Sequence, residues 1–239
     1  MESLAVADVC IEWGVLGKYT GDFDWAQASY ERALAISERV DGSISHRVAT
    51  VCHNLGGLAH ARGDFALGEP WARRAVTVRT ALMGPAEPVV AADRAAWAAL
   101  LEGCGRLDEA EAVLRQAMAV FQKCYGPEHY EVAVTLHNLA ALRHRRGDIE
   151  AAVQGYTLAL NLKARLLGPE HPDCAITLIN LATAHREKGN NAEAAAQYTR
   201  AIATLAARVA PDHPTLRLAR ERLNALGGEE PPLGRKGAL

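Results

Sequence analysis

The chain has 239 residues, of which 49% are apolar, and its formal net charge is −2 at pH 7. So small a charge gives no long-range field that would favour nucleic acid or an anionic membrane. No stretch approaches the roughly 18 uninterrupted apolar residues that a membrane-spanning helix requires. The five cysteines form no C-x-x-C pair, and no basic run precedes an apolar stretch near Met1. We therefore expect a cytoplasmic protein with reduced thiols and no signal peptide.

A glycine turn recurs along the chain at a constant spacing of 42 residues. We call these five residues the turn glycines: Gly21, Gly63, Gly105, Gly147 and Gly189. An alanine follows each of them by twelve residues: Ala33, Ala75, Ala117, Ala159 and Ala201. A fixed period over most of a chain predicts an array of stacked units that share one core.

The segments between the turns have the apolar spacing of amphipathic helices, as at Val132, Leu136 and Leu139. The first helix of each unit, helix A, is predicted at 5–20, 46–62, 87–104, 129–146 and 171–188. The second, helix B, is predicted at 23–40, 65–83, 108–125, 149–167 and 191–209. A further helix at 213–226 is expected to cap the array, because it is rich in charge.

Local signals mark the ends of these helices. Each turn glycine ends helix A, since glycine tolerates the left-handed conformation that follows a helix. The next residue is expected to cap helix B at Asp22, Asp64, Asp148 and Asn190. Arg106 cannot cap, so that helix B is predicted to start later, at Asp108. A Gly-Pro or Ala-Pro pair then closes each unit from the second onward, since proline prevents continuation of the helix.

These signals predict an all-α fold, a right-handed α-solenoid of five helix-turn-helix units within residues 1–226. The predicted units are about 5–42, 43–84, 85–126, 127–168 and 169–210, followed by the capping helix. Residues 227–239 combine glycine, proline and charge, and they are expected to form a disordered tail.

The pattern of large residue, small residue, glycine turn and alanine resembles the tetratricopeptide repeat. The loop Leu-Gly-Pro-Glu-His-Pro at 167–172, followed by Asn180-Leu181-Ala182, is similar to the 42-residue repeats of kinesin light chain and its bacterial relatives. The third unit departs from this pattern, with Ala96 where the family favours asparagine. The resemblance implies a concave groove lined by the A helices that holds a peptide. The motor-binding elements of a light chain are not visible.

Three asparagines lie nine residues before a turn glycine, at the groove position that the resemblance implies: Asn54, Asn138 and Asn180. An amide can bond both N–H and C=O of a peptide backbone, and asparagines at this position do so in kinesin light chains. The alternative is that duplication copied an ordinary polar surface residue.

Histidine and arginine supply the other candidate peptide contacts. His53 and His137, beside two of the asparagines, would select side chains. His144, Arg145 and Arg186 would anchor an acidic residue, although positive charge at a helix end is also favourable on its own account. If these histidines titrate near neutral pH, affinity should change between about pH 6 and 7.5.

No catalytic motif, phosphate loop or metal-ligand spacing is present, so we expect no enzyme, no cofactor and no metal. Histidines seven apart on one helix lie about 10.5 Å apart along its axis and cannot share one zinc ion. The predicted function is a scaffold or adaptor that binds a protein or peptide, possibly an acidic one, in the groove. The alternative is a structural module that self-associates through its uncapped first helix. The sequence identifies neither the partner nor the oligomeric state.

Overall fold

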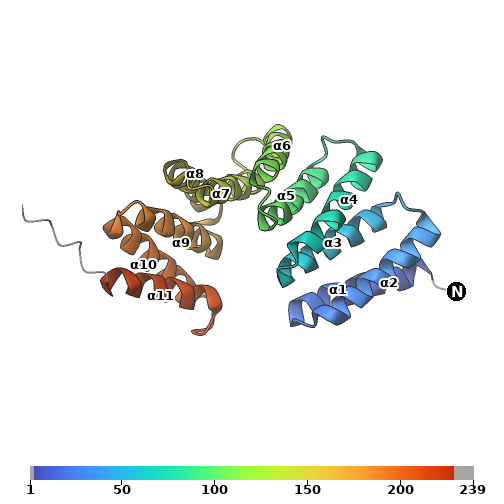
Figure 1. Ribbon diagram of the computed structural model, residues 1–239, viewed down its shortest axis with the longest axis horizontal. Coiled ribbons are helices and arrows are strands. Elements are labelled where there is room, and N and C mark those ends of the chain that lie inside the picture. Colours follow the sequence, from blue (N-terminus) through green and yellow to red (C-terminus); the bar gives the residue numbers. More distant parts are fainter. Residues whose placement is uncertain (1–2, 229–239) are drawn as a thin grey trace, which may run out of the picture. The chain divides into compact units, whose positions relative to one another are not determined.

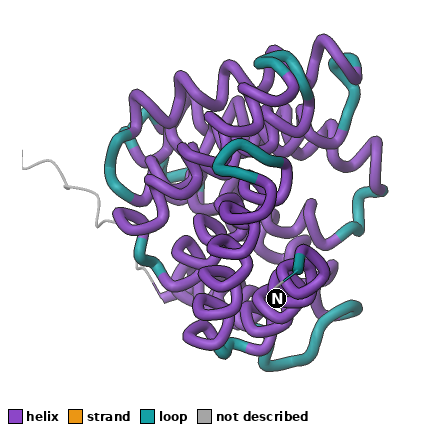
Figure 2. Tube along the Cα trace, turned by 90° about the vertical axis from the view of Figure 1, so that its right-hand side faces the viewer, coloured by secondary structure: helices purple, strands orange, loops and turns teal. Residues whose placement is uncertain are grey.

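The computed structural model describes residues 3–228, and all regular secondary structure in that range is helical (Figures 1 and 2). The chain forms two compact units, each containing several repeats; from here on the first unit is Met1–Pro127 and the second unit is Glu128–Leu239. The first contains α1 (Leu4–Thr20), α2 (Phe23–Asp41), α3 (His46–Arg62), α4 (Phe65–Met83), α5 (Pro88–Gly103) and α6 (Leu107–Tyr125). The second contains α7 (Tyr130–Arg145), α8 (Ile149–Leu167), α9 (Pro172–Glu187), α10 (Asn191–Ala206) and α11 (Pro214–Gly228).

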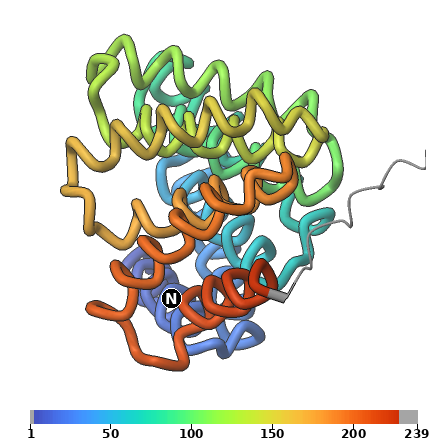
Figure 3. The backbone as a smooth tube through the Cα atoms, turned by 90° about the vertical axis from the view of Figure 1, so that its left-hand side faces the viewer, coloured from blue at the N-terminus to red at the C-terminus, as the bar shows by residue number. Residues whose placement is uncertain are grey.

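Successive helices pair as the sequence predicts, with α1, α3, α5, α7 and α9 as A helices and the even-numbered ones as B helices. In the second unit, α9, α10 and α11 follow one another from gold to red, each beside its predecessor (Figure 3). The largest difference in bounds is in α10, which ends at Ala206, three residues before the predicted end at 209. Residues 227 and 228 belong to α11, so the expected tail does not include them. The rest of that tail, 229–239, lies outside the described residues.

The turn glycines end the A helices in the left-handed conformation. Gly63 has a φ of 81° and Gly147 a φ of 84°, values that a side chain would strain. The residue after the glycine caps helix B in only two repeats: Asp22 accepts from Trp25 N at 3.2 Å, and Asp148 accepts from Ala151 N at 3.3 Å.

Two expected caps and one expected start of helix B differ from the prediction. Asp64 and Asn190 hold the N-cap position, but their side chains make no cap hydrogen bond. Helix α6 begins at Leu107, one residue before the predicted start. The Arg106 guanidinium lies over this end of the helix and bonds Glu109 at 2.7 and 2.6 Å. An ion pair with the first turn thus takes the place of a side-chain cap.

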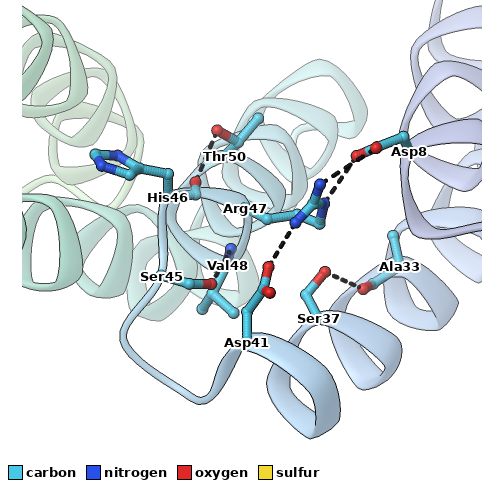
Figure 4. Close-up of polar contacts among 9 residues, drawn as sticks. All are labelled: Asp8, Ala33, Ser37, Asp41, Ser45, His46, Arg47, Val48 and Thr50. Atoms are coloured by element: carbon cyan, nitrogen blue, oxygen red, sulfur yellow. Dashed lines mark hydrogen bonds and ion pairs between the residues drawn. The ribbon is translucent and has the colours of Figure 1, made fainter. Parts of the chain in front are cut away.

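A polar cluster joins the first three helices (Figure 4). Arg47 of α3 bonds Asp8 of α1, with Nε 2.8 Å from Oδ1, and also reaches Asp41 at the end of α2. The guanidinium holds the pKa of the Asp8 carboxyl below its usual range. The Ser45 hydroxyl accepts from Val48 N at 3.3 Å and caps α3. This end of the first unit is therefore fixed by both charge and capping.

Small residues at the repeated positions bring the two helices of each hairpin close together. The five alanines that follow the turn glycines by twelve residues are at most 1% exposed. A Cβ on Gly155 of α8 would lie 2.8 Å from Ala140 Cβ of α7, so only glycine fits there. Cys10 and Cys52 are buried, and burial raises the pKa of Cys52 to about 11.

Trp13 is not a core residue, although the same repeat position of α3 is buried. Its side chain is 46% exposed, whereas Leu55, at the same position of α3, is 5% exposed. The face of α3 that carries Leu55 packs on the preceding helices, and α1 has no preceding helix in the described residues. None of the helices in residues 3–228 is long and apolar enough to cross a membrane.

Replacing Asp148 by alanine should lower the free energy of unfolding by about 1 kcal/mol, because one N-terminal amide of α8 loses its acceptor. Urea unfolding followed by circular dichroism measures this change. The matched control is Asn190→Ala, at the same position of the next repeat, where no cap bond exists; its effect should stay within about 0.5 kcal/mol. Equal losses in both variants would contradict the assignment.

Candidate functional site

The predicted contact residues lie on A helices in both units. In the first unit, α3 carries His53 and Asn54. In the other unit, α7 carries His137, Asn138, His144 and Arg145, and α9 carries Asn180 and Arg186. All of these residues are partly buried except Arg145, which is exposed.

His137 is held in a hydrogen-bonded cluster between α7, α8 and α9. Its Nδ1 lies 3.1 Å from Thr177 Oγ1, and its Nε2 lies 3.2 Å from Asn180 Nδ2. Lys163 donates to the same Thr177 oxygen at 3.1 Å, and Thr177 donates its own proton to Asp173 O at 3.2 Å. Since Thr177 has no second proton, His137 Nδ1–H is the donor and Nε2 accepts from Asn180.

This cluster requires a neutral imidazole. Burial, and to a smaller extent the nearby Lys163 charge, lower the pKa of His137 to about 4. Protonation of Nε2 would also remove the acceptor for Asn180. The expectation that this histidine titrates between pH 6 and 7.5 is therefore wrong, because desolvation outweighs its partial contact with water.

The first unit repeats the same geometry with different chemistry. His53 Nδ1 lies 2.8 Å from Asp93 Oδ1, and Arg79 Nε lies 2.6 Å from Asp93 Oδ2. These three residues precede His137, Lys163 and Thr177 by 84 positions each. The Asp93 side chain is 3% exposed, so its charge is matched by Arg79 rather than by solvent.

Some candidate contacts are already engaged within the chain, and others are not. His144 Nε2 lies 2.9 Å from Glu187 Oε2, and its ring meets Tyr156 edge-on with centroids 6.0 Å apart. By contrast, the side chains of Asn54, Asn138 and Arg186 make no hydrogen bond or ion pair within residues 3–228. The structure thus brings His137 and Asn180 together, and it leaves the amides of Asn54 and Asn138 available.

Sequence reasoning missed the groups that hold the two histidines. The sequence does contain a pattern that could have identified them. A basic residue lies sixteen residues after a turn glycine, at Arg79 and at Lys163. A polar residue lies twelve residues before the following turn glycine, at Asp93 and at Thr177. Among the described residues there is no group of three or more histidine, cysteine, aspartate or glutamate side chains placed to hold a metal ion.

Comparison with protein families finds the tetratricopeptide repeat at residues 48–88, 89–163 and 144–207, which together make up more than half of the chain. The chain belongs to the tetratricopeptide repeat family. Its fold is accordingly an all-α repeat solenoid, as the sequence predicted. Comparison with curated proteins finds no match.

Solved tetratricopeptide-type structures share this fold. A kinesin light chain-type protein from Podosopora anserina, with nearly identical TPR-like repeats, is 22% identical with a TM-score of 0.70, covering 85% of this chain and 97% of its own. BtubC (BKLC) from P. vanneervenii is 21% identical with a TM-score of 0.70, covering 99% and 87%. The Rap conjugation gene regulator of plasmid pLS20, solved with the Phr* peptide, is 18% identical with a TM-score of 0.73, covering 91% and 57%.

The histidine cluster makes stability depend on pH. The pKa of His137 is about 4 in the folded chain, against about 6.5 for an unfolded one, so the unfolded state binds the proton more readily. Stability should be unaffected above pH 6.5, fall as the pH drops below it, and be lower by about 3 kcal/mol at pH 4.

Urea unfolding of wild type and His137→Gln between pH 4 and 7 measures this effect, and the variant should lose less stability on acidification. An NMR titration of the His137 ring should give a midpoint near pH 4. A midpoint above pH 6 would contradict the assigned tautomer and its environment.

Proposed function

We propose that this tetratricopeptide repeat protein is a non-enzymatic scaffold or adaptor that binds a peptide or partner segment on the face formed by its A helices. The observation that carries the proposal is the pair of half-buried amides at Asn54 and Asn138, which have no partner within residues 3–228. An amide fixed on a helix and left unbonded can take both a C=O and an N–H from a peptide backbone.

Other side chains complete the proposed contact surface. Asn180 uses Nδ2 to bond His137, which leaves its Oδ1 for a peptide N–H. His53 and His137 would shape the pockets for partner side chains, and His144, Arg145 and Arg186 would attract acidic ones. The Rap regulator, solved with its peptide, supports the view that this fold can hold a peptide. Five free cysteines support a reducing, cytoplasmic setting.

Peptides selected from a random 12-residue library on the immobilised protein test this function. Asn138→Ala should weaken their binding about five-fold, since one hydrogen bond contributes about 1 kcal/mol. The matched control is Asn161→Ala on the exposed face of α8, a B helix, which should leave affinity unchanged. Circular dichroism verifies that both variants fold. Equal affinity in wild type and Asn138→Ala, or a loss in the control alone, would contradict the proposal.

The second candidate function is self-association through α1. Val9, Trp13 and Leu16 form an apolar stripe and are 48%, 46% and 52% exposed. The same positions of α3 carry Val51 and Leu58, which are 0% and 2% exposed. A stripe of half-exposed aliphatic and aromatic side chains is typical of an interface.

Light scattering after size exclusion tests this candidate. Self-association predicts a mass that rises with concentration and returns to the monomer value in Leu16→Glu. Leu158→Glu is the matched control, because Leu158 is also exposed, at 58%, but lies on α8. A monomer mass at every concentration would exclude this function and leave the peptide-binding proposal unaffected.

A further inference from the structure

A pocket of about 260 Å³ opens on the A-helix face of the first unit. Residues of α1, α3, α4 and α5 line it, among them Lys18, His53, Gly57, His60, Ala96 and Ala99. Its base is apolar, formed by Ala72 and Leu100 together with these small residues. No acidic side chain is among the described residues that line it. The pocket thus combines an apolar base with nitrogen-bearing side chains.

The pocket exists because a small residue replaces a tyrosine. Tyr156 occupies this repeat position in the second unit, where it is 2% exposed and packs against His137 and His144 with centroid distances of 5.3 and 6.0 Å. Ala72, 84 residues earlier, cannot fill the equivalent space. Leu100 fills part of it from α5, and the remainder stays open to the A-helix face.

Two further differences leave His53 and His60 with fewer hydrogen bonds than the histidines at the same positions of the second unit. In the second unit, Asn180 bonds His137 and Glu187 bonds His144. The corresponding residues of the first unit are Ala96 and Gly103, which have no polar side chain. Within residues 3–228, His53 is therefore bonded to Asp93 alone, through Nδ1, and its Nε2 is unbonded. His60 has no hydrogen bond or ion pair within residues 3–228; its ring contacts Phe65 edge-on.

Lys18 adds an amine to the same space. A Cβ placed on Gly57 would lie 3.1 Å from Lys18 Nζ, so the amine extends from α1 over the glycine of α3. Lys18 makes no ion pair within the described residues. Lys18 and His60 therefore line the pocket without an ion pair within residues 3–228, and His53 lines it with its Nδ1 bonded to Asp93.

We propose that this pocket binds the carboxylate of an aspartate or glutamate side chain in the bound peptide. Lys18 supplies the positive charge, His60 donates a hydrogen bond, and His53 does so when protonated, with Asp93 holding its other nitrogen. The apolar base accommodates the methylene groups of the acidic side chain. The inference rests on the proposed peptide function and adds to it a site for an acidic side chain in the first unit, through Lys18 and His60, which are not among the contact residues predicted from the sequence.

The smallest probe is N-acetyl-glutamate N-methylamide, compared with the uncharged N-acetyl-glutamine N-methylamide. Titration of either compound into the full chain is followed by NMR through the ring signals of His53 and His60. Saturating shifts are expected with the glutamate compound, and none with the glutamine compound at equal concentration. Identical responses to both compounds, or no response to either, would overturn the proposal.

Three variants test whether the glutamate compound binds in this pocket. Gly57→Ala places a methyl group under Lys18 Nζ while improving helix propensity, so binding should fall at least five-fold without loss of stability. Lys18→Gln should weaken binding about ten-fold, since a charge-assisted bond is lost. Lys123→Gln removes the same charge from exposed α6 of the same unit and should change nothing. Equal affinity in Lys18→Gln and Lys123→Gln would overturn the assignment.

The library-selected peptides separate this inference from the function on which it rests. If they bind wild type and Gly57→Ala equally and tolerate amide replacement of every acidic residue, the pocket assignment fails while peptide binding stands. If no peptide is selected but the glutamate compound binds through Lys18, the pocket stands and the peptide function fails. Loss of peptide affinity in Gly57→Ala, together with dependence on one acidic residue, supports both.

Discussion

Close contact between the two helices of each hairpin is the constraint on which the rest of the structure depends. A Cβ on Gly14 would lie 2.3 Å from the Tyr30 ring, and the alanines twelve residues after the turn glycines are almost fully buried. A larger side chain at these positions would separate the helices and lose the dispersion contacts of the core. Because the turn glycines are spaced by 42 residues, these packing positions recur at the same place in every repeat. The positions of helix A that do not pack against helix B therefore recur as well.

Those remaining positions are where the repeats have acquired different chemistry. At His137 both ring nitrogens are bonded: Asn180 bonds Nε2, Thr177 bonds Nδ1 and is itself bonded by Lys163, and burial keeps the imidazole neutral. At His53 only Nδ1 is bonded within residues 3–228, to the Asp93 carboxylate, because Ala96 occupies the position that Asn180 holds in the second unit. The same backbone geometry therefore produces a fully bonded imidazole at His137 and one with an unbonded nitrogen at His53.

Much of the fold was predictable because its determinants are local. Turn glycines, helix caps and apolar spacing act within a few residues, and the helix bounds agree within three. The site was predicted less well because its contacts join residues about 40 positions apart. His137 could be placed on the A-helix face, but its bond to Asn180 depends on how α7 and α9 pack, and its pKa depends on burial beside Lys163. The exposure of Trp13 likewise depends on packing, since burial at its position requires a preceding helix.

The central claim is that partners bind to the A-helix face, with the first-unit pocket as one contact. The most direct measurement is a map of backbone amide chemical shifts on addition of a library-selected peptide. The account predicts that the largest changes occur in α1, α3 and α5 around Lys18, Gly57 and Ala99, with further changes near Asn138. Changes confined to the B helices α2, α4, α6 and α8 would contradict it.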